Sequence, residues 1–449
     1  MKHVILGAGP AGVIAAETIR KHAPNDDIVI VGDETEAPYS RMAIPYLLIG
    51  KVGEDGTHLR HGKDHYAKLG LVIKRGQRAT AVDVAKKNVT LDDGSTLAYD
   101  RLLIATGSSP ASPPIPGIHA AGVHPCWTLQ DARAIAQLAN KGARVLQMGA
   151  GFIGCIIMEA LAARGVQLTV VEMGDRMVPR MMGPTAGGMI KDWCEKQGVR
   201  VFTGTRVEAI ETGGSAATGG GLLSKIATAF SIGAGSGSAT SAPLRVKLSN
   251  GQWLDADLVI SATGVKPNIG FLENSGVRCL LGVLTDEHLQ TNVAGIYAAG
   301  DCAEAFDKVS GKTIVSAIQP NAAEQARVAA LNMVGQRAEL RGVTQINVLD
   351  TLGLISTSFG DWQGVPGGER VELTDRHAGK HLSLQFSGER LVGCNSIGWT
   401  EHVGAMRGLV EGQIKLGEWK QRLLDDPTQL MPAYLATAQA QDHKALVRA

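Results

Sequence analysis

Residues 4–12 read VILGAGPAG, and this stretch decides how the first part of the chain folds. Val4 to Leu6 is a short apolar run that predicts a buried strand, and a helical apolar pattern follows the glycines through Ile19. A second apolar run, Ile28 to Val31, comes next. The order strand, glycine-rich turn, helix and strand predicts a βαβ unit with parallel strands.

The same order of elements recurs further along the chain. An apolar run at 144–148 precedes the turn GAGFIG at 149–154, and a run at 168–171 follows the helical segment. Residues 101–107 and 257–264 also match each other, because each is an apolar run that ends in Ala-Thr-Gly. These repeats indicate an internal duplication and predict two Rossmann-like units, one inserted into the other.

The three glycines of each turn predict a site for the pyrophosphate of a dinucleotide. The first permits a tight turn, the second lets the backbone approach the phosphates, and the third lets helix and strand pack closely. The phosphates then face a helix amino terminus, whose free N–H groups favour negative charge. The glycines are Gly7, Gly9 and Gly12 in the first unit, and Gly149, Gly151 and Gly154 in the second.

An acidic residue closes the second strand of each unit. Asp33 stands where a carboxylate would accept hydrogen bonds from an adenosine ribose, with an ordinary turn carboxylate as the alternative interpretation. Glu172 is its counterpart in the second unit. A carboxylate there repels a ribose 2′-phosphate and so indicates NAD rather than NADP, although Arg176 and Arg180 could offset part of the repulsion.

Composition narrows the function classes. The 449 residues predict two to four domains, and 44 Lys and Arg against 43 Asp and Glu leave a net charge of +1. We therefore expect no nucleic-acid partner. The six cysteines show no CxxC and no metal-ligand spacing, which predicts no metal site and favours a reducing cytoplasm. The longest uncharged apolar stretch, 145–158, is too short for a transmembrane segment.

Two further regions depart from the Rossmann pattern. Residues 213–242 consist mainly of Gly, Ala, Ser and Thr and predict a flexible insertion. Within it Leu222, Ile226 and Phe230 recur at helical spacing, and this stripe would pack on its own domain, dock to a partner subunit or touch a membrane surface. After about residue 336, four short alternating strands and a helical stretch at 402–411 predict a C-terminal α+β domain.

A final motif completes the pattern. Residues 296–301 read IYAAGD, a strand that closes in Gly300 and Asp301, whose backbone and carboxylate suit a polyhydroxylated chain such as ribityl. Two GxGxxG turns, two Ala-Thr-Gly strand ends and this Gly-Asp pair resemble, in this order, the FAD-dependent pyridine nucleotide-disulfide oxidoreductase superfamily over about residues 1–335. The resemblance implies an FAD-dependent NAD(H) oxidoreductase of the α/β class.

The resemblance also implies three domains. They are an FAD-binding domain at 1–118 and 256–335, an NAD-binding domain inserted at 119–255, and a C-terminal interface domain with a tail at 336–449. It assigns to FAD the residues Gly7, Gly9, Pro10, Ala11, Gly12, Asp33, Arg41, Ala105, Thr106, Gly107, Gly300, Asp301 and Asn321. It assigns to NAD the residues Gly149, Gly151, Phe152, Ile153, Gly154, Glu172 and Gly264.

Two of the FAD assignments carry open alternatives. Arg41 lies in a segment that resembles the flavin-lining segment of rubredoxin and ferredoxin reductases, and the alternative is an ordinary surface arginine. Residues 319–325 resemble the helix start that faces the flavin pyrimidine, where a positive helix end would ease hydride acceptance; the alternative is a plain helix cap.

Two departures from the family pattern bear on the chemistry. Met42 stands where thiol-dependent relatives carry a reactive cysteine, and a thioether forms neither a thiolate nor a mixed disulfide. Tyr46 and Ile156 stand where many relatives pair a Lys with a Glu. We therefore expect hydride transfer to depend on stacking geometry, and we assign no acid or base catalyst.

Because the chain has no redox thiol, its electrons must pass to a centre outside it. The predicted function is electron exchange between NAD(H) and an iron–sulfur protein or subunit. The chain would be free-standing, like rubredoxin or ferredoxin reductases, or the FAD subunit of a hetero-oligomeric complex, similar to aldehyde oxidoreductases and phenylglyoxylate dehydrogenases. The alternatives are an NADH oxidase that reduces oxygen and a flavin-binding interaction subunit with little turnover.

Overall fold

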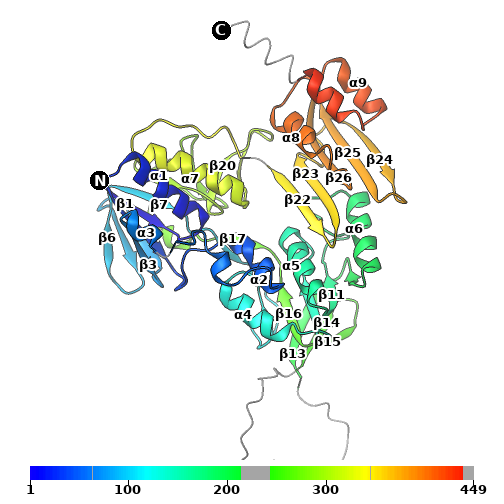
Figure 1. Ribbon diagram of the computed structural model, residues 1–449, viewed down its shortest axis with the longest axis horizontal. Helices are drawn as coiled ribbons and strands as arrows, with labels where there is room; N and C mark the ends of the chain where they lie inside the picture. Colours follow the sequence, from blue (N-terminus) through cyan, green and yellow to red (C-terminus); the bar gives the residue numbers. More distant parts are fainter. Residues whose placement is uncertain (63, 214–242, 344, 438–449) are drawn as a thin grey trace, which may run out of the picture.

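The computed structural model describes residues 1–62, 64–213, 243–343 and 345–437, which form three lobes (Figure 1). The predicted insertion and its apolar stripe, from residue 214 to 242, lie outside the described residues. Within the described ranges, no helix is long and apolar enough to cross a membrane.

The first lobe is built around a five-stranded parallel sheet in the order β19-β7-β1-β2-β3. The strands are β1 (Lys2–Leu6), β2 (Asp27–Gly32), β3 (Leu71–Arg75), β7 (Arg101–Ile104) and β19 (Ile296–Ala298). Helices α1 (Pro10–His22) and α7 (Gln319–Met333) cover one face, and the meander β4 (Ala79–Asp83), β5 (Asn88–Leu91) and β6 (Thr96–Ala98) covers the other. This two-sided cover explains why β1 and β7 are apolar at successive positions.

The second lobe repeats this plan with the sheet order β12-β11-β10-β16-β9. Its strands are β9 (Val123–His124), β10 (Arg144–Met148), β11 (Gln167–Val171), β12 (Arg200–Phe202) and β16 (Leu258–Ser261). One face packs on α4 (Leu129–Leu138), α5 (Phe152–Ala163) and α6 (Pro184–Lys196), and the other on the meander β13 (Val207–Thr212), β14 (Leu244–Leu248) and β15 (Trp253–Ala256). The shared plan agrees with the predicted internal duplication.

The second lobe is inserted between two strands of the first. The chain leaves β7 through β8 (Ser108–Pro110) and returns through β17 (Val265–Pro267), and these two strands pair antiparallel. The predicted domain boundary at residue 256 is placed too early, because β16 pairs with β10 and belongs to the second sheet. The second unit therefore extends through Ser261.

The third lobe is an antiparallel sheet in the order β22-β23-β26-β25-β24, with two helices against it (Figure 1). Its elements are β22 (Ile346–Thr351), β23 (Leu354–Gly360), β24 (Glu369–Asp375), β25 (Lys380–Ser387), β26 (Arg390–Ile397), α8 (Val403–Glu411) and α9 (Glu418–Asp425). The sequence predicted four of these strands and missed β24, most of whose residues are exposed and polar. Only Val371 of this edge strand is half-buried against the core, so the strand has little of the apolar pattern by which strands are predicted.

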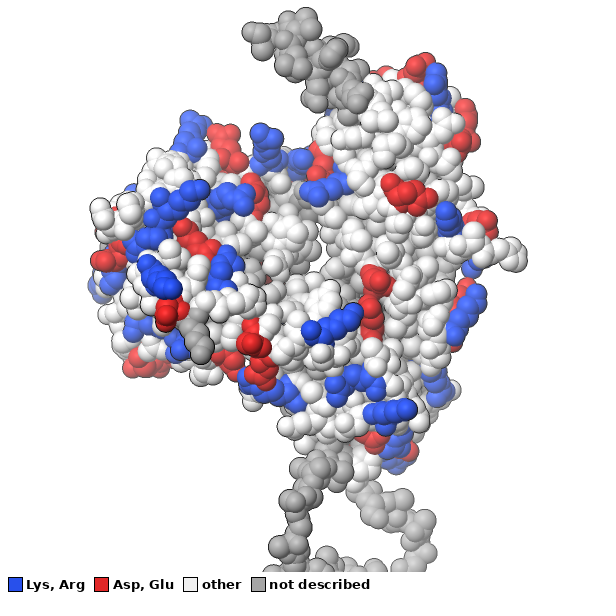
Figure 2. Space-filling view, in the orientation of Figure 1, with Lys and Arg blue, Asp and Glu red and all other residues white. Residues whose placement is uncertain are grey.

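The remaining short elements surround the two Rossmann-like sheets. They are α2 (Ile44–Leu48), α3 (His65–Lys68), β18 (Val283–Leu284), β20 (Ala303–Phe306), β21 (Thr313–Val315) and the 3-10 turns Arg41–Ala43, Asp55–Thr57 and Gly270–Leu272. On the face that Figure 2 shows, Lys and Arg are interspersed with Asp and Glu, as the near-zero net charge predicts.

Replacing two helical glycines by alanine tests the packing of the first unit. A Cβ on Gly12 in α1 would collide with the carbonyl oxygen of Gly7, whereas a Cβ on Gly188 in α6 would meet nothing within 4 Å. We expect Gly12→Ala to destabilise the fold by about 1–3 kcal/mol or more, and Gly188→Ala to stabilise it by about 0.5–1 kcal/mol. Scanning calorimetry of both variants checks this, and equal midpoints would contradict it.

Candidate functional site

The first glycine turn joins β1 to α1. Gly7 has a φ of +119°, and a Cβ there would collide with the carbonyl oxygen of Ala105 at the end of β7. A Cβ on Gly12 would likewise collide with the carbonyl oxygen of Gly7. A Cβ on Gly9, however, would meet nothing within 4 Å. The outer glycines are therefore required by packing, while the middle one borders open space that can admit a phosphate.

The second glycine turn, between β10 and α5, repeats this geometry. Gly149 has a φ of +94°, and its Cβ would collide with the carbonyl oxygen of Ala262 at the end of β16. Gly154 lies against Gly149, and a Cβ on Gly151 would meet nothing within 4 Å. Phe152 and Ile153 are the first two residues of α5 and are both half-buried. Both turns thus have the shape that a pyrophosphate requires.

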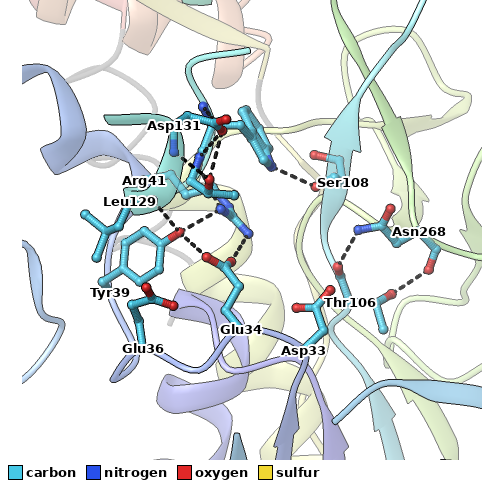
Figure 3. A network of polar contacts seen from close by, with 12 residues as sticks. Asp33, Glu34, Glu36, Tyr39, Arg41, Thr106, Ser108, Leu129, Asp131 and Asn268 are labelled. Carbon is cyan, nitrogen blue, oxygen red and sulfur yellow. Dashed lines mark hydrogen bonds and ion pairs between the residues drawn. The ribbon is translucent and has the colours of Figure 1, made fainter. Parts of the chain in front are cut away.

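The two Ala-Thr-Gly segments sit where the chain crosses between the units. Thr106 Oγ1 donates to the Asn268 carbonyl at 2.7 Å, and Asn268 Nδ2 donates back to the Thr106 carbonyl at 3.0 Å (Figure 3). Gly107 and Gly264 have φ values of +65° and +109°, which favour glycine. Sequence reasoning missed Asn268, because no motif marks a residue that braces the end of a distant strand.

The Gly-Asp pair lies beside the first glycine turn. Gly300 has a φ of +82°, and its Cβ position is 3.2 Å from Ala11 Cβ of α1 and 3.7 Å from Ala322 Cβ of α7. The Asp301 carboxylate accepts a hydrogen bond from Ser108 Oγ at 2.8 Å. Burial raises the pKa of Asp301 above its ordinary value, while Ser108 and the charge of Arg41 act in the opposite direction. The amino-terminal ends of α1 and α7 and the Asp301 carboxylate therefore lie close together.

The start of α7 contributes to the same place. Its first turn has no side-chain cap, and Asn321 is 9% exposed and donates to Ser316 Oγ at 2.7 Å. The Oε1 atom of the buried Gln325 accepts from the Gly300 N–H at 2.7 Å. Helix α7 therefore holds the Gly-Asp turn in position through Gln325.

Arg41, which the sequence predicts to contact the flavin, forms hydrogen bonds within the chain in the structure. Its guanidinium pairs with Glu34 at 2.7 Å and donates to the Tyr39 hydroxyl at 2.9 Å and the Trp127 carbonyl at 2.8 Å (Figure 3). Arg41 thereby joins the first unit to the segment that leads into α4. All of these hydrogen bonds are to protein groups, so the assignment of Arg41 to FAD stays a prediction.

The two acidic residues differ in their surroundings. Asp33 is 47% exposed and forms an ion pair with Arg78 at 3.0 Å. Glu172 is 9% exposed, and its two carboxylate oxygens accept from the Ala150 and Gly174 N–H groups, each at 2.7 Å. A carboxylate oxygen accepts more than one hydrogen bond, so Glu172 keeps the capacity to bind a ribose hydroxyl.

The basic residues after Glu172 do not form ion pairs with it in the structure. Arg176 donates to the Met182 carbonyl at 2.8 Å and pairs with Asp175 at 2.7 Å. Arg176 therefore does not neutralise the carboxylate of Glu172, whose assignment to NAD stays a prediction.

The structure also places the residues that depart from the family pattern. Met42 and Tyr46 are 48% and 53% exposed, and Ile156, in α5, is half-buried against the core of the second lobe. Burial raises the pKa values of the Cys126 and Cys194 thiols to about 12, so both stay protonated at neutral pH. Among the described residues, no group of three or more His, Cys, Asp and Glu could hold a metal ion.

Two Rossmann-like units, each with open space beside the middle glycine of its turn, define a protein that binds two dinucleotides. The chain matches the family model "Pyridine nucleotide-disulphide oxidoreductase" over residues 1–329 and belongs to that family. Membership confirms the predicted family, the cofactor pair FAD and NAD(H), and the enzyme class, an NAD(H) oxidoreductase.

Individual relatives cover nearly the whole chain. The epsilon subunit of NADH-dependent phenylglyoxylate dehydrogenase from Aromatoleum evansii is 29% identical over 429 residues, 95% of each chain. An NADH oxidase from Methanocaldococcus jannaschii is 30% identical over 423 residues, 89% of this chain and 88% of that protein. Ferredoxin reductases are also among the relatives, as the predicted resemblance requires.

A solved structure shows the same fold. The chain superimposes on the covalent putidaredoxin reductase–putidaredoxin complex with a TM-score of 0.83 and 23% identity, over 97% of this chain and 99% of that chain. The likeness includes the C-terminal domain, which the family model does not cover.

Two matched substitutions test the two glycine turns one at a time. Gly9→Val places a side chain in the open space at the first turn and Gly151→Val at the second, where a Cβ meets nothing within 4 Å. We expect Gly9→Val to weaken FAD retention by about tenfold or more, and Gly151→Val to keep FAD but weaken NADH binding by a similar factor. Flavin absorbance per chain and NADH titration measure the two effects. If both variants lost the same cofactor, the assignment of the sites would be wrong.

Proposed function

We propose that the chain passes electrons one at a time between FAD and an iron–sulfur protein or subunit outside itself. The observation that carries this proposal is Met42, which stands where a redox thiol would receive electrons in thiol-dependent members of the family. That thiol is missing, five of the six free cysteines are buried, and burial raises the pKa of all six thiols above the ordinary value. Since the thiolate is the reactive form, none of these cysteines is suited to take electrons from the flavin.

The residues present fit both cofactors. Gly9 and the start of α1 would hold the FAD pyrophosphate, Asp33 its ribose, and Asp301 its ribityl chain. Gly151 and the start of α5 would hold the NAD(H) pyrophosphate in the same way. FAD, when bound, accepts a hydride from NADH and releases electrons singly. The chain's contribution is to place the two rings together and to exclude water between them.

The second unit favours NADH over NADPH. The ribose position is bordered by the buried carboxylate of Glu172, and Arg176 is engaged by Asp175 and the Met182 carbonyl. A 2′-phosphate would therefore meet a negative charge without an available cation from Arg176.

Two observations support assembly with other subunits and a reducing compartment. The relative from Aromatoleum evansii is a subunit of a dehydrogenase and matches along 95% of each chain, which favours a similar place for this chain in a complex. A free-standing reductase of ferredoxin-like carriers is the simpler form of the same function. The cysteines are all free, and five of the six are buried, which favours the cytoplasm.

Anaerobic stopped-flow mixing tests the proposal. NADH should bleach the flavin absorbance at a saturable rate, NADPH should do so with about tenfold lower efficiency or less, and an oxidised ferredoxin should restore the absorbance. The control is Gly151→Val, which should keep the flavin spectrum and need about tenfold more NADH, or more, to reach the same bleaching rate. If NADH failed to bleach the flavin of the wild-type chain, the proposed function would be wrong.

The NADH oxidase relative favours a second candidate, in which oxygen is the acceptor. The same reduced chain, mixed with air-saturated buffer, distinguishes the two. Reoxidation by oxygen that is faster than reoxidation by any iron–sulfur acceptor would favour the oxidase. A flavin-binding subunit with little turnover would show neither bleaching nor reoxidation.

A further inference from the structure

A glutamine is buried beneath the second glycine turn. Gln147 lies in the middle of β10 and is 0% exposed, in a strand whose other interior residues are apolar. Its Oε1 atom is buried and has no hydrogen-bond partner in the part of the chain that the structure describes. A buried amide oxygen without a partner destabilises a fold, so stability alone does not explain this residue.

The other end of the Gln147 side chain holds the turn. Its Nε2 atom donates to the Gly149 carbonyl at 2.9 Å. The next group along the same peptide plane, the Ala150 N–H, donates to Glu172 Oε2 at 2.7 Å. The peptide between residues 149 and 150 is thus held at its oxygen by Gln147 and at its nitrogen by Glu172. Hydrogen bonds in such a chain polarise and strengthen one another.

The first unit lacks this arrangement. The position that matches Gln147 is Ile5, which has no donor, and its side chain lies near Gly12. The position that matches Glu172 is Gly32, because Val31 and Val171 both accept from the first glycine of their turn. The acid that follows, Asp33, is 47% exposed and accepts a hydrogen bond from Arg78. The duplicated units therefore share their backbone plan but differ in how the glycine turn is held.

We propose that Gln147 is a positioning residue for NADH, which fixes the glycine turn and Glu172 in the orientation that the dinucleotide needs. The inference rests on the proposed function, because it assumes that NADH binds at this turn. FAD stays bound through turnover, whereas the nicotinamide site empties and refills in each cycle. A turn that is held before binding loses less conformational freedom when NADH arrives.

Replacing Gln147 tests this role. Gln147→Met keeps the length of the side chain and removes the donor, and Gln147→Ile introduces the residue of the first unit. The matched control is Met148→Leu, the next residue of β10, whose side chain lies in the core on the other face of the sheet. Anaerobic stopped-flow reduction gives the dissociation constant of NADH and the limiting rate, and absorbance and calorimetry give FAD content and the thermal midpoint.

We expect both Gln147 variants to raise the dissociation constant of NADH about tenfold, with limiting rate and FAD content close to wild type. The thermal midpoint should stay close to that of the wild type, because removal of the unpartnered Oε1 atom offsets the loss of the hydrogen bond to the Gly149 carbonyl. An unchanged NADH dissociation constant in both variants would overturn the proposal, as would a loss of FAD or of stability that accounts for the weaker binding. If wild-type flavin were not reduced by NADH at all, the proposed function itself would fail.

Discussion

Close backbone packing at the glycine turns is the constraint on which the rest of the structure depends. In each unit the first glycine lies against the carbonyl at the end of a neighbouring strand, and the third lies against the first. No side chain fits at either position, so helix, turn and strand are locked together. The middle glycine is left beside open space, and the helix start faces it. One packing solution, used twice, therefore creates both dinucleotide sites.

The two Rossmann-like units differ in the residues that surround their glycine turns. The first unit gathers α1, α7, Gly300 and Asp301 around one site, as expected for a cofactor that stays bound. The second holds its turn through Gln147 and Glu172, as expected for a site that exchanges its ligand. Met42 removes the thiol that would carry electrons onward within the chain. In the proposed function, the flavin is therefore the point at which electrons leave for a partner.

The sequence was sufficient to predict the parts of the fold that depend on local patterns. The glycine turns, the parallel strands and the insertion of one unit into another follow from spacing and apolar runs, and the structure shows them all. The sequence was not sufficient where the fold depends on contacts between residues that are far apart along the chain. The predicted boundary at residue 256 lies before β16, which pairs with β10 in the second sheet, and the exposed strand β24 has only two apolar residues, Val371 and Leu373. The contacts of Arg41 and Asn268 likewise join segments that no motif connects.

The number of NADH molecules that fully reduce the chain tests most directly whether the flavin is its sole electron store. In an anaerobic titration of the FAD-loaded protein, about one NADH per FAD should bleach the flavin completely, since the flavin takes up a single hydride. A second redox centre, such as a thiol pair, would consume about two NADH per FAD. Full reduction at the lower ratio is the result expected here, and a requirement for the higher ratio would contradict electron transfer directly from flavin to an external partner.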